Sequence, residues 1–370
     1  MTRSDERTPI IPPVDWSSQR NQYSLNVVRV NIVTKTNWAN EKSIASYDSG
    51  FIHSLSNLLY LIIIFIKIFA KMDPKYLAFF EKFQVKYPEH FKLKDFETAI
   101  DLKPFSKHDG VQLLKDGVDG LSKMQEILYA HNQFSILIIF QAMDSAGKDG
   151  AIKHVMSGLN PQGVKVTSFK APNAIELDHD FFWRHSLALP GRGEIGIFNR
   201  SHYENVLVTR IHPEFILKEN LPGIRSVHDI TETFWTDRFR QIRNYEDNLH
   251  ANGTLVIKFF LHLSKDEQRK RLLERIDDQS KNWKFSHSDI EERKHWDDYQ
   301  HAYQEAIAAT STPNAPWYII PADDKWFARL AVAAVVTARM NRLELVFPTL
   351  HDTQLATLKK AKEKLKSEKD

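Results

Sequence analysis

The sequence of 370 residues contains no cysteine. This absence excludes a disulfide framework, a thiolate metal site and a cysteine nucleophile, and it fits a reducing cytoplasm, where we expect the protein to act. A strong excess of charge is absent too, because 50 basic residues face 47 acidic ones and leave a net charge of +3. A balanced total excludes no class of ligand, since a basic groove can coexist with it. The hydrophobic content of 42% suits a globular protein with a sizeable core.

Long hydrophobic runs are scarce, and the most apolar stretch is residues 58–66 within the segment 51–70. A membrane-spanning helix needs about 20 mostly apolar residues, so this run is short. Residues 1–50 are polar and aperiodic, and we expect residues 1–71 to form a poorly ordered N-terminal extension. We favour an upstream region translated in frame, with Met72 as the true start, over a membrane anchor. We therefore expect no membrane association.

The chain is organised around residues 135–150, SILIIFQAMDSAGKDG. The apolar residues 136–140 predict a strand that is buried on both faces of a parallel sheet. A turn of small residues follows, with Gly147 and Lys148 in it, and residues 151–157 favour a helix. This order predicts a phosphate cradle of backbone N–H groups to which Lys148 adds a positive charge. An ordinary turn with a solvated lysine is the alternative.

The loop departs from the usual phosphate-loop pattern G-x-x-x-x-G-K-[ST] at two positions. Ala142 stands where the first glycine would be, and Asp149 stands where the hydroxyl that binds Mg²⁺ would be. Asp144, inside the loop, offers a hard carboxylate oxygen in place of that hydroxyl. The residues of the loop expected to bind phosphate are Ala146, Gly147, Lys148, Asp149 and Gly150.

Strand-like and helix-like segments alternate along the rest of the chain. Further strands are predicted at residues 164–169, 194–198, 254–263 and 317–321. Helices are predicted at residues 111–131, 174–189, 291–309 and 326–343, and a charged helix that starts with a capping box at Ser264 and Glu267 is predicted to end at Ile276. This alternation predicts an α/β fold with a five-stranded parallel sheet flanked by helices. Residues 72–350 would form this domain, and residues 351–370 a charged C-terminal helix.

Ligands of such a sheet bind beyond the carboxyl ends of its strands, which draws attention to the end of the third strand. A phosphate-loop enzyme usually has a metal-binding aspartate there, whereas this chain has Asn199. Glu204 could supply the carboxylate instead, and Arg200 could grip a phosphate with two hydrogen bonds. The alternative is that Arg200 and Glu204, one helical turn apart, only pair with each other.

Residues 205–250 show no strand pattern and are rich in arginine, histidine and aromatic residues. An arginine-rich insertion between two strands predicts a helical lid that closes over phosphates and excludes water. A solvated helical face is the alternative for its charges, and core packing is the alternative for its aromatic residues.

Several long motifs of the chain resemble the type-2 polyphosphate kinase family. They are FQAMDSAGKDG, MSGLNPQGVKVTSFKAP, WRHSLALPGRGEIGIFNRSHYENVLVTRIHPE, NWKFSHSDIEERKHWDDYQHAYQEAI and APWYIIPADDKWFARL. The resemblance covers about residues 85–350. It implies a P-loop kinase fold with a helical lid. It also implies transfer of the terminal phosphoryl group of inorganic polyphosphate to a nucleotide, or the reverse reaction.

The resemblance further implies roles for individual residues. Asp144, Lys148, Arg200 and Glu204 would be catalytic, and Asp144 and Glu204 would hold Mg²⁺, with Mn²⁺ as an alternative. The further residues implied in phosphate or nucleotide binding are Lys153, Asn199, Arg210 and Lys284. Asn199 favours the subgroup that accepts both nucleoside monophosphates and nucleoside diphosphates. The expected acceptors are AMP and ADP, and GMP and GDP are additional candidates.

The implied partners are inorganic polyphosphate and nucleotides, with no nucleic acid, and the implied assembly is a homo-oligomer, either a dimer or a tetramer. Two other functions stay open on the sequence. One is an ATP-dependent kinase that acts on a small acceptor. The other is a non-catalytic protein that binds polyphosphate or nucleotide, which the altered loop positions Ala142 and Asp149 would fit.

Overall fold

The computed structural model describes residues 79–100 and 107–368, without the side chains of residues 107–111 and 284. The predicted N-terminal extension 1–71, its apolar segment 51–70 and the proposed start at Met72 lie outside the described residues. Among the helices of the described part, none is both long and apolar enough to cross a membrane.

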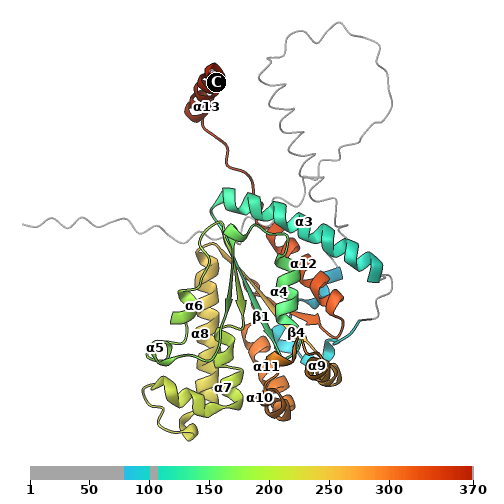
Figure 1. The fold of residues 1–370 in the computed structure, drawn as a ribbon. Coiled ribbons are helices and arrows are strands. Elements are labelled where there is room, and N and C mark those ends of the chain that lie inside the picture. Colours follow the sequence, from blue (N-terminus) through green and yellow to red (C-terminus); the bar gives the residue numbers. More distant parts are fainter. Residues whose placement is uncertain (1–78, 101–106, 369–370) are drawn as a thin grey trace, which may run out of the picture. The chain divides into compact units, whose positions relative to one another are not determined.

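Five parallel strands form one sheet in the order β2-β3-β1-β4-β5 (Figure 1), which confirms the predicted fold class. The strands are β1 (Ser135–Ala142), β2 (Val164–Ser168), β3 (Ile195–Asn199), β4 (Thr254–His262) and β5 (Trp317–Pro321). From β1 the chain runs to β2 at the edge of the sheet, returns to β3 between β2 and β1, and then crosses to β4 on the other side of β1. Such a reversal opens a crevice at the carboxyl ends of the strands, here between β1 and β3.

Long helices cover both faces of the sheet (Figure 1). They are α3 (Lys107–His131), α4 (Lys148–Met156), α8 (Glu232–Ala251), α11 (Trp296–Thr310) and α12 (Lys325–Asn341). A further helix, α9 (Lys265–Asp277), follows the carboxyl end of β4. On one face, α3, α4 and α12 share a core with Ile136, Ile138 and Phe140 of β1. On the other face, α8 and α11 pack with Leu137 and Ile139. β1 is therefore buried on both faces, as its apolar run predicts.

Short helical segments form most of the connections. Before β1 and between β1 and β3 they are η2 (Glu81–Phe83), η3 (Pro88–His90), η4 (Leu93–Asp95), η5 (Pro161–Gly163), α5 (Ala174–Leu177) and α6 (Trp183–Ser186). After β3 they are η6 (His202–Asn205), α7 (Val208–Ile211), η7 (Pro213–Glu219), η8 (Val227–Asp229), η9 (Asn282–Lys284), α10 (His287–Glu292) and η10 (Arg293–His295). The last element is α13 (Asp352–Ser367), whose residues are all exposed.

The single helix predicted at residues 174–189 is wrong, because α5 and α6 are separate one-turn helices. Between them, the carboxylate of Asp180 accepts a hydrogen bond from the backbone N–H of Phe182 at 2.9 Å. A short polar side chain that bonds the backbone in this way competes with helix formation. The capping box predicted at α9 is half right. Ser264 accepts from the N–H of Glu267, but the carboxylate of Glu267 pairs with Arg271 instead.

Helix α8 shows that the second half of the predicted lid belongs to the core. Its residues Trp235, Phe239 and Ile242 are buried in the cluster that also contains Val256 and Phe260 of β4. A helix that buries this much apolar surface against the sheet is a fixed part of the domain. The lid stays a prediction only for the residues before α8, which contain α7, η7 and η8.

His185, in α6, predicts a dependence of stability on pH. Its ring is fully buried, with Nδ1 2.9 Å from the carbonyl oxygen of Phe181, and Nε2 has no hydrogen-bond partner among the described residues. Burial lowers the pKa of His185 from 6.5 to about 2. Below pH 6.5 the unfolded chain therefore binds a proton that the folded chain does not bind, so the free energy of unfolding falls as the pH falls.

We expect His185→Phe, which keeps a ring at this position, to weaken that dependence. Between about pH 5.5 and 4, the free energy of unfolding should fall by about 1.4 kcal/mol less per pH unit than in the wild type. Urea unfolding at several pH values measures both slopes. Equal slopes for the two proteins would show that His185 does not titrate between its folded and unfolded states as its burial requires.

Candidate active site

The loop between β1 and α4 has the backbone shape of an anion cradle. Ser145 has φ 63° and Gly147 has φ 100°, so both lie in the left-handed region, and Gly147 is the residue that precedes α4. The first N–H groups of a helix have no acceptor within the helix and carry a partial positive charge. The loop thus directs backbone donors toward the crevice beyond β1, where a phosphate can be bound.

Lys148 lies folded back on this loop. Its Nζ donates to the carbonyl oxygen of Ala142 at 2.9 Å and lies 3.5 Å from that of Met143. Burial lowers the pKa of Lys148, and the nearby carboxylate of Asp144 acts in the opposite direction. The ammonium thus contacts neutral carbonyl groups. A phosphate oxygen could take their place, and its negative charge would make the hydrogen bond to the ammonium stronger.

A cavity of about 620 Å³ opens in front of the loop. The loop, the residues that follow β2 and the end of β3 form its walls, and Arg275 of α9 closes one side. A second, much smaller cavity of about 40 Å³ adjoins it, and Asp144 and Arg200 border both. The adjoining cavity is lined by the acidic and phenolic groups of Glu204, Asp289, Glu292, Tyr299 and Tyr303.

Arg200 links the two cavities through two ion pairs. One guanidinium nitrogen lies 3.0 Å from Oδ1 of Asp144 and another lies 3.3 Å from Oε2 of Glu204. The carboxylates of Glu204 and Asp144 raise the pKa of Arg200. The pairing with Glu204 that the sequence left as an alternative is therefore present, but it is part of a larger arrangement that joins the ends of β1 and β3.

Asn199 holds the neighbouring position at the end of β3. Its Nδ2 donates to the carboxylate of Asp149 at 2.8 Å and lies 3.4 Å from the hydroxyl of Ser168. The amide thus connects the first turn of α4 to the ends of β3 and β2. An aspartate in its place would set two carboxylates against each other.

Most of the predicted site residues meet in one place. The larger cavity is lined by Asp144, Ala146, Gly147, Lys148, Asp149, Asn199 and Arg200, and Glu204 lines the smaller one. Gly150, Lys153 and Arg210 line neither of the two. Lys153 is exposed on α4, and Arg210 is held by Glu232 and Glu305 at 3.0 and 3.1 Å. The side chain of Lys284 lies outside the description.

Two arginines of α9 support the loop, and the sequence analysis did not find them. The buried guanidinium of Arg271 donates to the carbonyl oxygens of Ser145 and Ala146 at 3.3 and 3.0 Å, and to those of Ala322 and Asp323 at 2.7 and 3.0 Å. Arg275 donates to the hydroxyl of Ser145 and pairs with Asp289, both at 2.8 Å. Their helix follows the carboxyl end of β4, which is the signal that could have placed them at the site.

Asp289 of α10 is a further residue that the sequence analysis missed. Burial raises the pKa of its carboxyl, and the negative charge of Asp144 raises it further. The nearby hydroxyl of Tyr303 is also buried, and both burial and Glu204 raise its pKa. The small cavity thus brings four carboxylates, those of Asp144, Glu204, Asp289 and Glu292, together with the guanidinium groups of Arg200 and Arg293.

The site combines two chemical capacities. Loop N–H groups, Lys148, Arg200 and Arg275 can neutralise phosphate oxygens, and the carboxylates of Asp144 and Glu204 can bind a divalent cation. Within residues 79–100 and 107–368, no group of three or more His, Asp or Glu side chains is placed to hold a metal ion. A metal here would therefore take the rest of its ligands from water and phosphate, which is the common arrangement for Mg²⁺.

The chain is similar in sequence to known proteins of one family. The sequence model of the family Polyphosphate kinase 2 (PPK2) matches residues 105–346. The chain is 51% identical over 268 residues to an ADP-polyphosphate phosphotransferase of Rhodopseudomonas palustris, covering 72% of this chain and 92% of that protein. It is 42% identical over 270 residues to an AMP/ADP-polyphosphate phosphotransferase of Meiothermus ruber, covering 72% and 95%.

A solved structure shares the fold as well. The crystal structure of polyphosphate kinase 2 from Arthrobacter aurescens TC1 matches with a TM-score of 0.65 at 36% sequence identity. The match covers 75% of this chain and 98% of that one.

The contacts of Arg271 predict that it holds the loop in shape. We expect Arg271→Met to lower the free energy of unfolding by about 2 to 4 kcal/mol, because it leaves buried carbonyl oxygens without a donor. Amide hydrogen exchange at residues 145–148 should become faster. Arg269→Met on the same helix is the control, since that side chain is 67% exposed and should change the unfolding free energy by at most about 0.5 kcal/mol. Wild-type exchange in Arg271→Met would rule out this support.

Proposed function

Because the chain belongs to the type-2 polyphosphate kinase family, we propose that it is a polyphosphate-dependent nucleotide kinase. It transfers the terminal phosphoryl group of inorganic polyphosphate to a nucleotide and also runs in reverse. The observation that carries this proposal is the meeting of the phosphate loop with Arg200, which lies between Asp144 and Glu204. The family match includes every one of these residues.

The transfer itself needs positioning and neutralisation of charge more than covalent chemistry. An oxygen of the acceptor's terminal phosphate attacks the last phosphorus of the polymer. The bridging P–O bond breaks, and the shortened polyphosphate leaves with the electron pair. Lys148, Arg200 and the N–H groups that begin α4 surround the cavity and can offset the charge on the equatorial oxygens. Asp144 can orient the acceptor phosphate from the same wall.

Mg²⁺ belongs to this proposal, and the carboxylates present fit it. Asp144 is about one third exposed at the boundary of the two cavities, and Glu204 faces the same guanidinium from the other side. Mg²⁺ is usually bound by one or two carboxylates together with substrate phosphates. These two residues would hold it, with Mn²⁺ as a substitute, and the bound ion would neutralise charge that develops during the transfer.

The acceptor range is the finer part of the proposal. We expect both AMP and ADP to be accepted, and GMP and GDP are further candidates. Support comes from Asn199, whose amide engages Asp149 at the end of β3, and from the Meiothermus ruber relative that is named for both AMP and ADP. A cytoplasmic location and a homo-oligomeric state, either a dimer or a tetramer, are also proposed and rest on the family resemblance.

The first test measures ATP formation by the purified protein with polyphosphate and Mg²⁺, with either AMP or ADP and no ATP added. We expect ATP from both acceptors, because the donor is the polymer and the acceptor can be a mono- or a diphosphate. ATP from ADP alone would keep the kinase and remove the monophosphate acceptor. Folded protein that forms no product from either acceptor would refute polyphosphate as donor.

Substitution of Lys148 tests whether the loop acts in catalysis. We expect Lys148→Ala to lower kcat by about 100- to 1,000-fold, as is typical when one donor that stabilises transition-state charge is removed. The control is Lys123→Ala, which changes an exposed lysine on α3 that lines neither cavity. A variant that lost affinity for polyphosphate but kept kcat would assign Lys148 to binding alone.

A further inference from the structure

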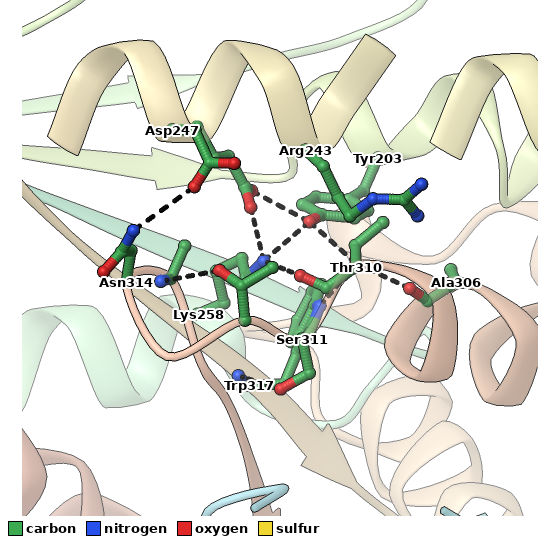
Figure 2. Close-up of polar contacts among 12 residues, drawn as sticks. Tyr203, Arg243, Asp247, Lys258, Ala306, Thr310, Ser311, Asn314 and Trp317 are labelled. Carbon is green, nitrogen blue, oxygen red and sulfur yellow. Dashed lines mark hydrogen bonds and ion pairs between the residues drawn. The ribbon is translucent and has the colours of Figure 1, made fainter. Parts of the chain in front are cut away.

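A fully buried lysine stands in the middle of β4 and plays no part in the chemistry described above. Lys258 lies between Val256 and Phe260 on the sheet face that α8 and α11 cover. Its Nζ donates to Oε2 of Glu246 at 2.5 Å, to the carbonyl oxygen of Thr310 at 2.8 Å and to the hydroxyl of Tyr203 at 2.9 Å (Figure 2). All three donors of the ammonium are thus satisfied.

Glu246 completes the ion pair from helix α8. Burial opposes ionisation of this carboxyl, but the ammonium of Lys258 holds its pKa below the ordinary value. The second carboxylate oxygen accepts a hydrogen bond from the hydroxyl of Tyr203 at 2.8 Å. The Tyr203 hydroxyl also lies 3.0 Å from Oγ1 of Thr310, at the end of α11 (Figure 2). Four separate elements, β4, η6, α8 and α11, therefore meet at this point.

Such a pair is hard to explain by stability alone. Removal of two charges from water costs about as much as their attraction returns, and well-packed apolar residues in their place are often equally stable or more so. A buried pair that is completely hydrogen-bonded does fix one arrangement of the groups around it. Tyr203 precedes the site residue Glu204 directly and lies three residues after Arg200. His202 of the same turn also faces the pair, with its Nε2 3.5 Å from Oε1 of Glu246.

The segment from Arg200 to Glu204 faces two ways. Ser201, His202 and Tyr203 are completely buried, whereas Arg200 and Glu204 at its two ends line the cavities. The hydroxyl of Ser201 accepts hydrogen bonds from the side-chain amide of Gln141 in β1 and from the backbone N–H of Tyr203. Arg200 has φ 64°, a left-handed conformation that is unfavourable for a non-glycine residue and persists only where surrounding contacts enforce it.

We propose that Tyr203, Lys258 and Glu246 are positioning residues for the phosphoryl transfer. They anchor the η6 turn from behind, so that Arg200 and Glu204 stay in place opposite Asp144. This inference rests on the proposed function for its kinetic consequences, but the order of the turn can be measured without turnover.

Tyr203→Phe is the sharpest test, because it keeps the ring that packs 4.7 Å from Trp317 and removes only the hydroxyl. We expect kcat to fall by about 10- to 100-fold, as small misplacements of catalytic groups typically cause. The Mg²⁺ concentration for half-maximal rate should rise, since Glu204 would no longer be held in place. Amide hydrogen exchange at residues 200–205 should also become faster. A merely structural role would change the melting temperature without changing the Mg²⁺ requirement of the folded enzyme.

The matched control is Tyr318→Phe. Tyr318 is also buried, lies in the core of the opposite sheet face, and has its hydroxyl 3.5 Å from Gln84 rather than near the site. We expect this variant to keep the wild-type kcat and Mg²⁺ requirement.

The double variant Lys258→Met/Glu246→Gln separates positioning from stability, because it removes both charges together and leaves no unpaired ion. It should show the same kinetic defect as Tyr203→Phe, and the triple variant should be no worse, since the three residues act as one unit.

Two results would overturn the inference. One is wild-type kcat, Mg²⁺ requirement and exchange in Tyr203→Phe. The other is an equal defect in Tyr318→Phe, which would indicate general softening of the core. If the wild-type protein forms no ATP, the proposed function fails. The exchange measurement then still decides whether the hydroxyl orders residues 200–205.

Discussion

The ion pairs of Arg200 with Asp144 and Glu204 are the interaction on which the site depends. Asp144 belongs to the loop after β1, and Arg200 and Glu204 follow β3. These strands are neighbours in the sheet although they are far apart in the sequence, because the chain reverses direction across β1. The fold thus supplies the proximity, and the ion pairs convert it into a defined geometry. The same carboxylates keep the guanidinium charged and oriented at the cavity wall.

Two buried cations, Arg271 and Lys258, contact the backbone segments that carry the site residues. Arg271 donates hydrogen bonds to two carbonyl oxygens of the phosphate loop, and Lys258 contacts the η6 turn through the hydroxyl of Tyr203. Each cation would be costly to bury alone, and each is surrounded by acceptors that satisfy its donors. Both contacts oppose motions that would spoil the site: Arg271 resists collapse of the loop, and Lys258 resists relaxation of the left-handed Arg200. These buried charges would thus support the geometry of the proposed active site from within the core.

The sequence predicted the sheet, and it named most of the residues that meet at the candidate site, because those signals are local. The apolar run of β1 followed by Gly147 and Lys148, and the cluster after β3, need only short-range patterns and the rule that ligands bind at strand ends. Arg271 and Arg275 escaped because their helix is highly charged and such a helix usually faces water. Lys258 is the one charged residue before His262 in a strand of apolar residues, and only the structure shows that its side chain is buried with partners. The helix expected at residues 174–189 failed at Asp180, where a side chain bonds the backbone, a competition that periodicity alone does not detect.

The cations of the candidate site are each paired with groups of the protein, and this pairing affects how the site would bind a polyanion. Lys148 donates to the carbonyl oxygen of Ala142. Arg275 contacts Ser145 and Asp289, and Arg200 pairs with Asp144 and Glu204. A phosphate that enters must exchange these partners, so its net binding free energy is the difference between two sets of contacts. Lys148 exchanges most favourably, because it gives up neutral carbonyl groups for an anion. Arg200 would give up carboxylates, and this exchange would become favourable if a divalent cation bound to those carboxylates. Cation and phosphate would therefore bind cooperatively, each releasing the partner that the other requires.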